Sequence, residues 1–542
     1  MITLYGTSVF QGISIGKILF YERSKYNVDK KTVHNVDAEI KRFELAKESA
    51  LLELQELNEM ALSKANEINA AIFEGHQLIL QDEGYYNFVI DLILNQGANA
   101  EFAVKQTSEK YSQMFLSMKD EYMQARAFDI IDVSERLLRL LNGDKQEEFV
   151  LNEPVILAAD DLIPSETIRL DKNKVLGFAI MYGSENSHTA IIAKALNIPA
   201  IIGIGKELTK EYNNRLAIID GISGTLYIDP DANTLEEMKK KQKELLLEED
   251  LLTKLVGKDN VTIDGKRVDI YGNISNLSDV DEVLKNDGGG IGLFRSEFLY
   301  LERDTYPSEE EQFLVYKEIA KAMNGKKVII RTLDIGADKK IDYFGLEKEE
   351  NPAMGFRGIR ICLTRTEIFK TQLRAILRAS MYGTISIMLP MIISVSEVRK
   401  AKDILEEVKM ELIKEHISFK NDIEIGIMIE TPAAVMISDE LAKEVDFFSV
   451  GTNDLTQYTL AIDRQNTMLD TFFDAHHPAI LKMLHMVVKN AHENGIWAGI
   501  CGELASDLTI TRELLQMGYD ELSVSPSMIL RLRKKVRELK LS

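Results

Sequence analysis

The chain has 542 residues, of which 45% are hydrophobic and 28% are charged, and its formal net charge is −21 at pH 7. This length is typical of two to four domains with buried cores, which excludes a largely disordered chain. The acidic balance argues against a nucleic-acid-binding protein, because such proteins normally present a basic face. Any macromolecular partner is instead expected to carry basic patches.

The two cysteines and the N-terminus indicate where the protein acts. Cys362 and Cys501 are too few for a disulfide framework and are compatible with a reducing compartment. The first residues carry no basic region of the kind that opens a signal peptide. No run of about 18 apolar residues is present, so no membrane insertion is expected. We therefore predict a cytoplasmic protein.

The N-terminal part predicts a small α/β unit interrupted by helices. Residues 1–22 read as one or two short strands with glycine turns. Glycine and proline almost vanish over residues 37–142, where apolar residues recur at helical spacing, as in "AEIKRFELAKESALLELQEL". Strand-like and helical runs then alternate over residues 154–230. We expect the first strands to complete this α/β unit, so that the helical segment is an insertion.

These changes of character place the domain boundaries. A charged stretch rich in helix formers, "DANTLEEMKKKQKELLLEEDLLTKL", separates the α/β unit from the rest and is expected to be a connecting helix. The predicted parts are an α/β domain of residues 1–22 and 144–230, an inserted helical domain of 23–143, a linker helix of 231–256 and a C-terminal domain of 257–542.

The C-terminal domain predicts a (β/α)₈ barrel. Eight apolar, strand-like runs are mostly separated by helical segments over roughly 280 residues, which is the pattern of this fold. The runs are "RVDIYGN", "GGIGLFRSE", "KVIIRTLD", "ISIMLPM", "IEIGIMIET", "DFFSVGTND", "IWAGICGE" and "ELSVS". An open doubly wound sheet is the alternative, but the number of runs and their even spacing favour the barrel.

Most of these runs end in a residue with chemical function. The terminal residues are Asn273, Arg295, Arg331, Glu430, Asn453 with Asp454, and Cys501. In a barrel the C-terminal ends of all strands meet at one mouth, where active sites lie. Individually, Arg295 could pair with Glu297, Glu430 could cap the following turn, and Cys501 could be an inert buried residue. Their shared position at strand ends favours a site.

The charged residues suggest binding of a metal and a phosphate. Glu430 and Asp454 supply hard oxygen ligands of the kind that Mg²⁺ prefers. Arg295 and Arg331 supply planar forks for a phosphate. Together, a metal and arginines would stabilise the charge on a phosphoryl group during its transfer.

The remaining polar residues indicate the substrate. Asn453 and Arg464 could hold a carboxylate, so a small, phosphorylated and carboxylated molecule is expected, and phosphoenolpyruvate fits this description. Enolpyruvate gains a proton at C3 when it becomes pyruvate, and Cys501 is a candidate for supplying it.

His188 follows a Gly/Ser/Asn-rich turn and precedes an apolar, helix-like run. Ser187 is a plausible N-cap, which would place His188 at the first helical position, and Asn197 with Pro199 would end the helix. A helix N-terminus disfavours imidazolium and favours a bound phosphate. Taken alone His188 could be a capping or core histidine, whereas beside a phosphoryl-transfer site it becomes a candidate nucleophile.

Several motifs make the sequence similar to the enzyme I family of the bacterial phosphoenolpyruvate-dependent sugar phosphotransferase system, over nearly the whole chain. The resemblance rests on these stretches: "SHTAIIAKALNIPAIIG", "GIGLFRSEFL", "RTLDIGADK", "ENPAMGFRGIR", "GIMIETPAA", "FFSVGTNDLTQYTLAIDR" and "CGELASD".

The resemblance implies a role for each candidate residue. By position, it implies a phosphorylated His188, the phosphate-binding residues Arg295, Arg331, Lys339 and Arg357, the Mg²⁺ ligands Glu430 and Asp454, the substrate contacts Asn453 and Arg464, and the general acid Cys501. It also implies that the helical insertion docks the phosphocarrier protein HPr and that the barrel forms a homodimer.

The stretch before His188 departs from the pattern of this family. The usual lead-in "GGRTSH" is "GSENSH" here, so Ser184, Glu185 and Asn186 replace a Gly-Arg-Thr triplet. The change removes one positive charge and adds a negative one beside the expected phosphohistidine. We expect an effect on transfer rate, phosphohistidine stability or carrier choice.

Two other functions fit part of the sequence. A pyruvate phosphate dikinase or phosphoenolpyruvate synthase would share the histidine domain and the barrel, but the chain has no spare length for their ATP-binding domain. An inactive regulatory paralogue would be favoured by loss of Glu430, Asp454 or Cys501, and all three are present.

Overall fold

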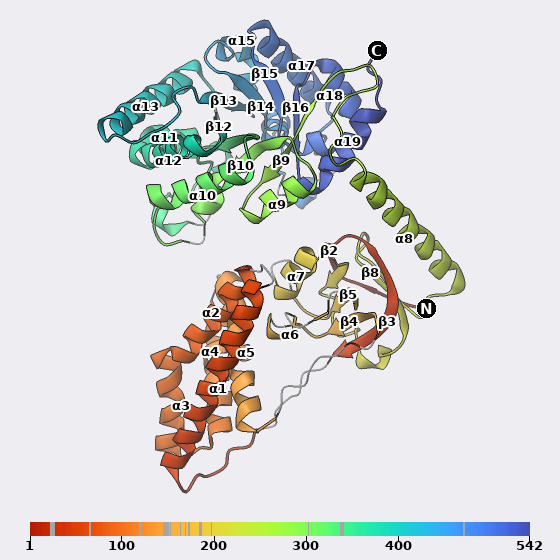
Figure 1. Ribbon diagram of the computed structural model, residues 1–542, viewed down its shortest axis with the longest axis vertical. Helices are drawn as coiled ribbons and strands as arrows, with labels where there is room; N and C mark the ends of the chain where they lie inside the picture. The colour runs from red at the N-terminus through yellow and green to blue at the C-terminus, as the bar shows by residue number, and fades with distance from the viewer. Residues whose placement is uncertain are drawn as a thin grey trace. The chain divides into compact units, whose positions relative to one another are not determined.

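The computed structural model describes two compact units, Met1–Leu247 and Glu248–Ser542 (Figure 1). Its described residues are 1–21, 28–63, 67–118, 121–144, 151, 153–162, 164–167, 170–171, 174–183, 187–196, 198–301, 303–336, 341–464, 466–469 and 472–542.

The N-terminal unit is built on one mixed sheet. Its order is β1-β8-β7-β3-β4-β5-β6-β2, and the β3, β4, β5 and β6 neighbours are parallel. The strands, within the described residues, are β1 (Ile2–Tyr5), β2 (Thr7–Phe10), β3 (Ile13–Tyr21), β4 (Val155–Ala159), β5 (Val175–Ile180), β6 (Ala200–Ile202), β7 (Leu216–Asp220) and β8 (Thr225–Ile228).

The first 21 residues form three strands, where the sequence predicted one or two. The chain turns at Gly6 and again at Gly12, where φ is +144° and most side chains would be strained. The two turns divide one apolar run into pieces that pair with β8, β6 and β7 separately. Each piece is too short to be recognised from alternation alone.

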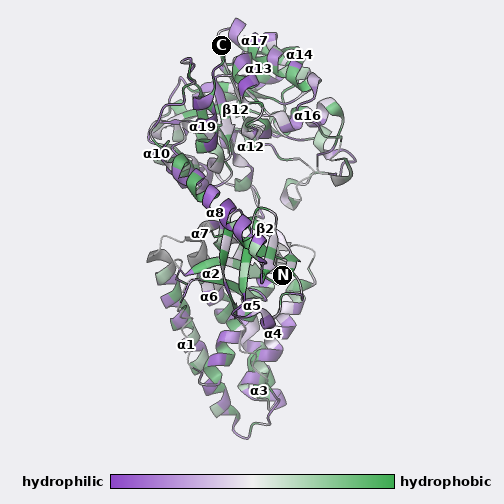
Figure 2. Cartoon of the chain, turned by 90° about the vertical axis from the view of Figure 1, so that its right-hand side faces the viewer, coloured by the Kyte–Doolittle hydropathy of each residue, from purple (hydrophilic) through white to green (hydrophobic). Residues whose placement is uncertain are grey.

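Five helices are inserted between β3 and β4, as predicted. In the described residues they are α1 (Val36–Ser63), α2 (Glu67–Gln81), α3 (Glu83–Gln96), α4 (Ala100–Leu116) and α5 (Glu121–Leu141). Phe43, Leu54 and Phe73 are fully or almost fully buried in their shared core. Figure 2 shows hydrophobic and hydrophilic residues mixed along each helix, as in amphipathic helices with one buried face.

Two further helices of this unit matter for function. Helix α7 (His188–Leu196) begins where expected, because the Ser187 hydroxyl accepts a hydrogen bond from the Ala190 N–H at 3.4 Å. Its predicted stop at Asn197 lies outside the described residues. Helix α8 (Ala232–Thr253) is the predicted connecting helix, and its Met238 packs against Ile13 and Ile218 of the sheet. A short helix, α6 (Pro164–Thr167), follows β4.

The C-terminal unit contains the predicted closed barrel of parallel strands. Its described strands are β9 (Asp269–Ile274), β10 (Gly290–Arg295), β11 (Lys327–Arg331), β12 (Thr384–Leu389), β13 (Glu424–Ile429), β14 (Phe447–Val450), β15 (Trp497–Ile500) and β16 (Glu521–Val524). Each of the eight predicted strand runs overlaps one of these strands, and the bounds differ by a single residue at the end of β9 and at the start of β12.

Helices surround this barrel (Figure 1). Those in the described residues are α9 (Ser278–Lys285), α10 (Glu309–Ala322), α11 (Ile359–Thr364), α12 (Thr366–Ala379), α13 (Val395–Lys414), α14 (Pro432–Met436), α15 (Ser438–Leu441), α16 (Thr452–Leu460), α17 (Pro478–Glu493), α18 (Thr511–Met517) and α19 (Ile529–Glu538). None of the helices in the described parts of the chain is long and apolar enough to cross a membrane.

Candidate active site

A pocket of about 840 Å³ opens at the C-terminal ends of the barrel strands. Eight of the ten predicted site residues line it, namely Arg295, Arg331, Arg357, Glu430, Asn453, Asp454, Arg464 and Cys501. The barrel therefore brings together side chains that are more than 200 residues apart in the sequence, as the positions of the strand ends predict.

The other two predicted residues are not seen in this pocket. Lys339 lies outside the described residues, as do Ser184, Glu185 and Asn186. His188 is the first residue of α7 in the N-terminal unit. Asn273, the last residue but one of β9, does not line the pocket. Its side-chain amide donates to the carbonyls of Cys501 at 2.9 Å and Ser523 at 3.1 Å, so it ties neighbouring strands together.

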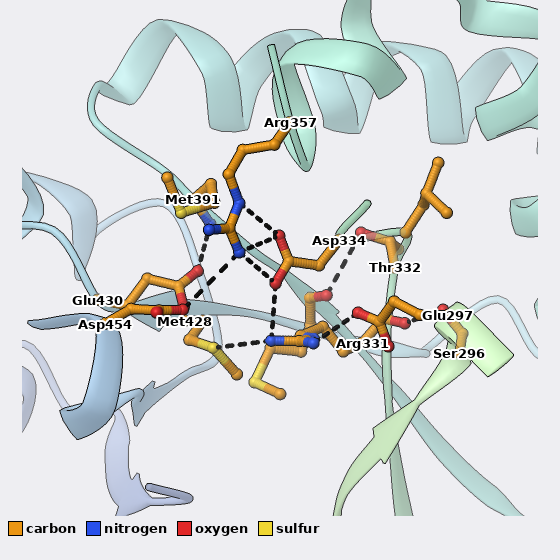
Figure 3. Close-up of polar contacts among 12 residues, drawn as sticks. Ser296, Glu297, Arg331, Thr332, Asp334, Arg357, Met391, Met428, Glu430 and Asp454 are labelled. Atoms are coloured by element: carbon orange, nitrogen blue, oxygen red, sulfur yellow. Dashed lines mark hydrogen bonds and ion pairs between the residues drawn. The ribbon is translucent and has the colours of Figure 1, made fainter. Parts of the chain in front are cut away.

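Asp334 connects two arginines of the pocket (Figure 3). Arg357 donates from Nη2 to both of its carboxylate oxygens, at 3.1 and 3.0 Å, and from Nε to one of them at 3.3 Å. Arg331 Nη1 lies 3.0 Å from the same carboxylate. Sequence reasoning missed Asp334, although it ends the run "KVIIRTLD" only three residues after Arg331.

Glu297 pairs with Arg331 and not with Arg295, which corrects the pairing considered from the sequence. Arg331 Nη2 donates to Glu297 Oε1 at 2.5 Å. Arg295 is exposed, and its Nη1 lies 3.5 Å from the Ser275 hydroxyl. Glu297 lies in the short turn that follows β10. Because Arg295 at the end of β10 pairs with Arg331 at the end of β11, this turn brings Glu297 next to Arg331.

The two buried arginines keep their charge. Burial alone would lower the pKa of Arg331, but Glu297 and Asp334 outweigh this effect and raise it. For Arg357 the opposing charges of Asp334 and Asp454 likewise raise the pKa against the effect of burial. Both guanidinium groups are thus fixed cations at the pocket wall.

Glu430 directly follows β13 and has one carboxylate oxygen available. Its Oε1 accepts a hydrogen bond from the Met391 N–H at 2.6 Å, and its buried Oε2 has no partner among the described groups. Burial raises its pKa well above the ordinary value, and the charges of Asp334 and Asp454 act in the same direction. Glu430 does not cap the next helix; the Thr431 hydroxyl does, accepting from the Ala434 N–H at 3.1 Å.

The donor set fits a divalent cation. Four carboxylates, on Glu297, Asp334, Glu430 and Asp454, face two buried guanidinium groups, and this leaves two formal negative charges if all are ionised. The described residues contain no group of three or more His, Cys, Asp or Glu side chains that could hold a metal by themselves. A cation beside Glu430 would take its remaining oxygen ligands from water and substrate, as Mg²⁺ commonly does.

Asn453, Arg464 and Cys501 line the rest of the pocket. The Asn453 amide donates to Glu503 Oε1 and its oxygen accepts from the Glu503 N–H, both at 2.9 Å, so its orientation is fixed. Arg464 Nη2 lies 3.9 Å from Asp454. Cys501 is 3% exposed, and burial raises the pKa of its thiol to about 12, so it holds its proton at neutral pH.

Three family models match the chain and define its class. Residues 249–541 match the PEP-binding domain of PEP-utilising enzymes, residues 5–126 match their N-terminal domain, and residues 151–224 match their mobile domain. The fold and the pocket thus belong to a PEP-utilising enzyme.

Curated relatives identify one family within this class. The phosphoenolpyruvate-protein phosphotransferases of Priestia megaterium and Bacillus subtilis (strain 168) are both 43% identical over 99% of this chain and 94% of their own length. That of Haemophilus influenzae is 42% identical over 97% of this chain and 92% of its own. The chain belongs to the phosphoenolpyruvate-protein phosphotransferase family. A solved structure titled as Enzyme I (nEIt) is 34% identical over 45% of the chain and 99% of its own, with a TM-score of 0.39.

Proposed function

We propose that this protein transfers the phosphoryl group of phosphoenolpyruvate to its own His188 and then to a histidine of an HPr-like carrier, releasing pyruvate. This is the first step of sugar uptake by a phosphotransferase system. The observation that carries the proposal is the barrel pocket, in which buried arginine forks, a carboxylate oxygen without a partner and a protonated thiol converge. The names of the relatives agree with it.

Phosphoenolpyruvate would bind through both of its anionic groups. Arg295 and Arg331 would hold the phosphate, with Arg357 and Lys339 completing the basic surround. Asn453 and Arg464 would hold the carboxylate. Because Asp334 and Glu297 already fix the Arg331 fork, little side-chain freedom is lost when the phosphate binds.

Glu430 and Asp454 would hold Mg²⁺, the cofactor expected for this site. When bound, the ion neutralises charge on the transferring phosphoryl oxygens and on the developing enolate. The unpartnered Glu430 oxygen and the excess of buried carboxylates support this assignment.

The covalent step would use His188. A neutral ring nitrogen forms the N–P bond in line with the breaking bond between phosphorus and the enol oxygen. The electron pair stays on the enolate, and the Cys501 thiol gives its proton to C3, which yields pyruvate. The N-terminus of α7 disfavours imidazolium before the transfer and stabilises the phosphate after it.

The remaining assignments follow the domains predicted above. Residues 1–22 and 144–230 would form the phosphohistidine domain that swivels, residues 23–143 would dock the HPr-like carrier, residues 231–256 would link them to the barrel, and residues 257–542 would bind phosphoenolpyruvate and form a homodimer. Two free, buried cysteines support action in the reducing cytoplasm.

An assay of pyruvate release tests this function against the dikinase alternative, which the relatives do not favour. The purified protein with Mg²⁺, phosphoenolpyruvate and an HPr-like carrier should release pyruvate in step with carrier phosphorylation and without ATP. Pyruvate formation that strictly requires AMP and pyrophosphate would instead indicate a dikinase. Carrier binding without any turnover would indicate a regulatory paralogue.

A further inference from the structure

One row of three residues crosses the barrel interior next to Cys501. Ser449 of β14 pairs with Gly499 of β15, and Gly499 pairs with Glu521 of β16. Residues paired in this way point to the same face of a sheet, and Cys501, two residues after Gly499, shares that face. This face is the barrel interior, because Cys501 and Phe447 lie in one buried cluster with residues of other strands.

Because residue 499 is glycine and has no side chain, the Glu521 carboxyl has room to lie above it. A Cβ at Gly499 would lie 1.9 Å from Glu521 Oε2, and one at Gly292 would lie 2.6 Å from Oε1. The Ser523 hydroxyl donates to Oε1. The carboxyl therefore lies over Gly499 of β15, between β16 and Ser449 of β14. This is the layer of side chains next to that of the Cys501 thiol.

Glu521 is buried and has no cation to neutralise it. It is 2% exposed, and in the described parts of the chain no lysine, arginine or histidine lies within ion-pair distance. The nearby Lys327 instead pairs with Glu424 at 2.7 Å. Burial raises the pKa of Glu521 to about 8, and the charge of Asp269 acts in the same direction despite the hydrogen bond from Ser523. The group is thus a neutral carboxylic acid at pH 7.

Ser449 completes this row of residues on β14, next to the Gly499 position over which the Glu521 carboxyl lies. Its hydroxyl is buried and has no hydrogen-bond partner by geometry among the described groups, yet it is close enough to Cys501 to lower the pKa of the thiol. A hydroxyl can donate one proton while it accepts another.

We propose that Glu521 returns the proton that Cys501 gives to the enolate, through the hydroxyl of Ser449. The proposal rests on the proposed function, in which the Cys501 S–H bond breaks as the C3–H bond forms. The thiolate then takes the Ser449 proton while Ser449 takes the Glu521 proton, which leaves thiol, hydroxyl and carboxylate. Glu521 regains a proton from water. Neither residue touches the substrate; both are positioning residues that act through Cys501.

The direction of this transfer agrees with the chemistry of the groups. The thiol, with a pKa of about 12, is a much weaker acid than the carboxyl, with a pKa of about 8, so the thiolate is reprotonated readily. Glu521 would regain its proton from the N-terminal end of the barrel, where its paired neighbour Asp269 is exposed. A bound substrate would close the other route at the pocket.

Deuterium exchange at C3 of pyruvate tests the relay. The full chain is mixed with Mg²⁺, phosphoenolpyruvate and pyruvate in D₂O, and the pyruvate methyl signal is followed by NMR, while rapid quenching gives the rate of phosphoprotein formation. In Glu521→Gln and Ser449→Ala we expect the ratio of exchange to phosphorylation to fall about tenfold or more, because the proton on Cys501 is trapped.

Glu424→Gln is the matched control, because this carboxylate lies at the same end of the barrel but is held by Lys327 and Ser386. It should keep the ratio of the unaltered protein. An unchanged ratio in both relay variants, or an equal loss in the control, would overturn the relay. If the unaltered protein forms no phosphoprotein from phosphoenolpyruvate, the proposed function fails instead.

Discussion

Asp334 determines where two arginines of the pocket point. It accepts from Arg357 through both oxygens and lies 3.0 Å from Arg331, whose other nitrogen donates to Glu297. These contacts hold Arg331 at two separate nitrogen atoms. The pairing with two carboxylates therefore depends on the planar shape of the guanidinium group as well as on its charge. A lysine, with a single nitrogen, could not satisfy both carboxylates.

Arg331→Lys should therefore cause a large loss of catalytic efficiency and a moderate loss of stability. We expect kcat/KM for phosphoenolpyruvate to fall about 100-fold, and the free energy of unfolding to fall by roughly 2 kcal/mol because a buried carboxylate loses its partner. Initial rates of pyruvate release and thermal unfolding measure the two effects. Arg399→Lys, at an exposed pair with Glu444, is the control and should change neither. An equal effect of both substitutions would contradict this role.

Glu521 also predicts how the stability of the barrel depends on pH. Its pKa of about 8 in the folded protein is above the ordinary value of 4.5, so the folded state binds more protons between these values. The contribution is fully present below about pH 4.5 and is lost as the pH rises through about 8. Glu521→Gln should thus raise the unfolding midpoint at pH 9 more than at pH 5. An identical gain at both values would contradict a neutral Glu521.

Sequence reasoning identified the residues that end strands, but it did not identify their partners. Arg331 and Glu430 follow apolar runs, which made them visible. Asp334 pairs with Arg357, 23 residues later and beyond a loop, and no local pattern connects the two. Glu521 was missed because it is the first residue of β16, so it lies toward the N-terminal end of the barrel and away from the mouth.

Among the elements, the start of α11 is constrained by its contact with Asp334. Gly358 precedes the helix with φ of +56°, and a Cβ there would lie 3.1 Å from Asp334 Oδ1 and from the Met391 side chain. Only glycine adopts this conformation at low cost and also leaves room for the carboxylate that holds Arg357. The backbone conformation at the start of α11 thus explains why the second glycine of "GFRGIR" is a glycine.

Gly358→Ala should reduce both stability and activity. We expect a loss of about 2 kcal/mol in the free energy of unfolding, and weaker binding of phosphoenolpyruvate as Arg357 shifts. Gly345→Ala is a close control, because Gly345 has φ of +55° but open space at the Cβ position. Thermal unfolding and KM compare the two. If Gly345→Ala costs as much in both measurements, the contact with Asp334 is not the cause.

The regular elements were largely predictable, and the short ones were not. Eight apolar runs at even spacing gave the barrel correctly, since each barrel strand is buried on both faces and reads as a continuous run. The three strands before residue 22 were underestimated, because their division depends on turns at Gly6 and Gly12 and on partners about 200 residues away.

At the scale of the whole molecule, the proposed nucleophile and the proposed substrate site belong to different units of the chain. His188 starts α7 in the unit Met1–Leu247, and the pocket lies wholly in Glu248–Ser542. Helix α8 joins them and is mostly hydrophilic (Figure 2). The proposed cycle therefore requires the two units to meet for the first transfer and to separate for the second.

The central claim is that phosphoenolpyruvate phosphorylates His188 directly. With Mg²⁺ and phosphoenolpyruvate but no ATP, we expect one acid-labile phosphate per chain, located on His188 by peptide mapping. The phosphate should be lost in His188→Gln and kept in His476→Gln, whose exposed ring is paired with Asp507 outside the pocket. Absence of the phosphate from the unaltered protein, or its persistence in His188→Gln, would contradict the account.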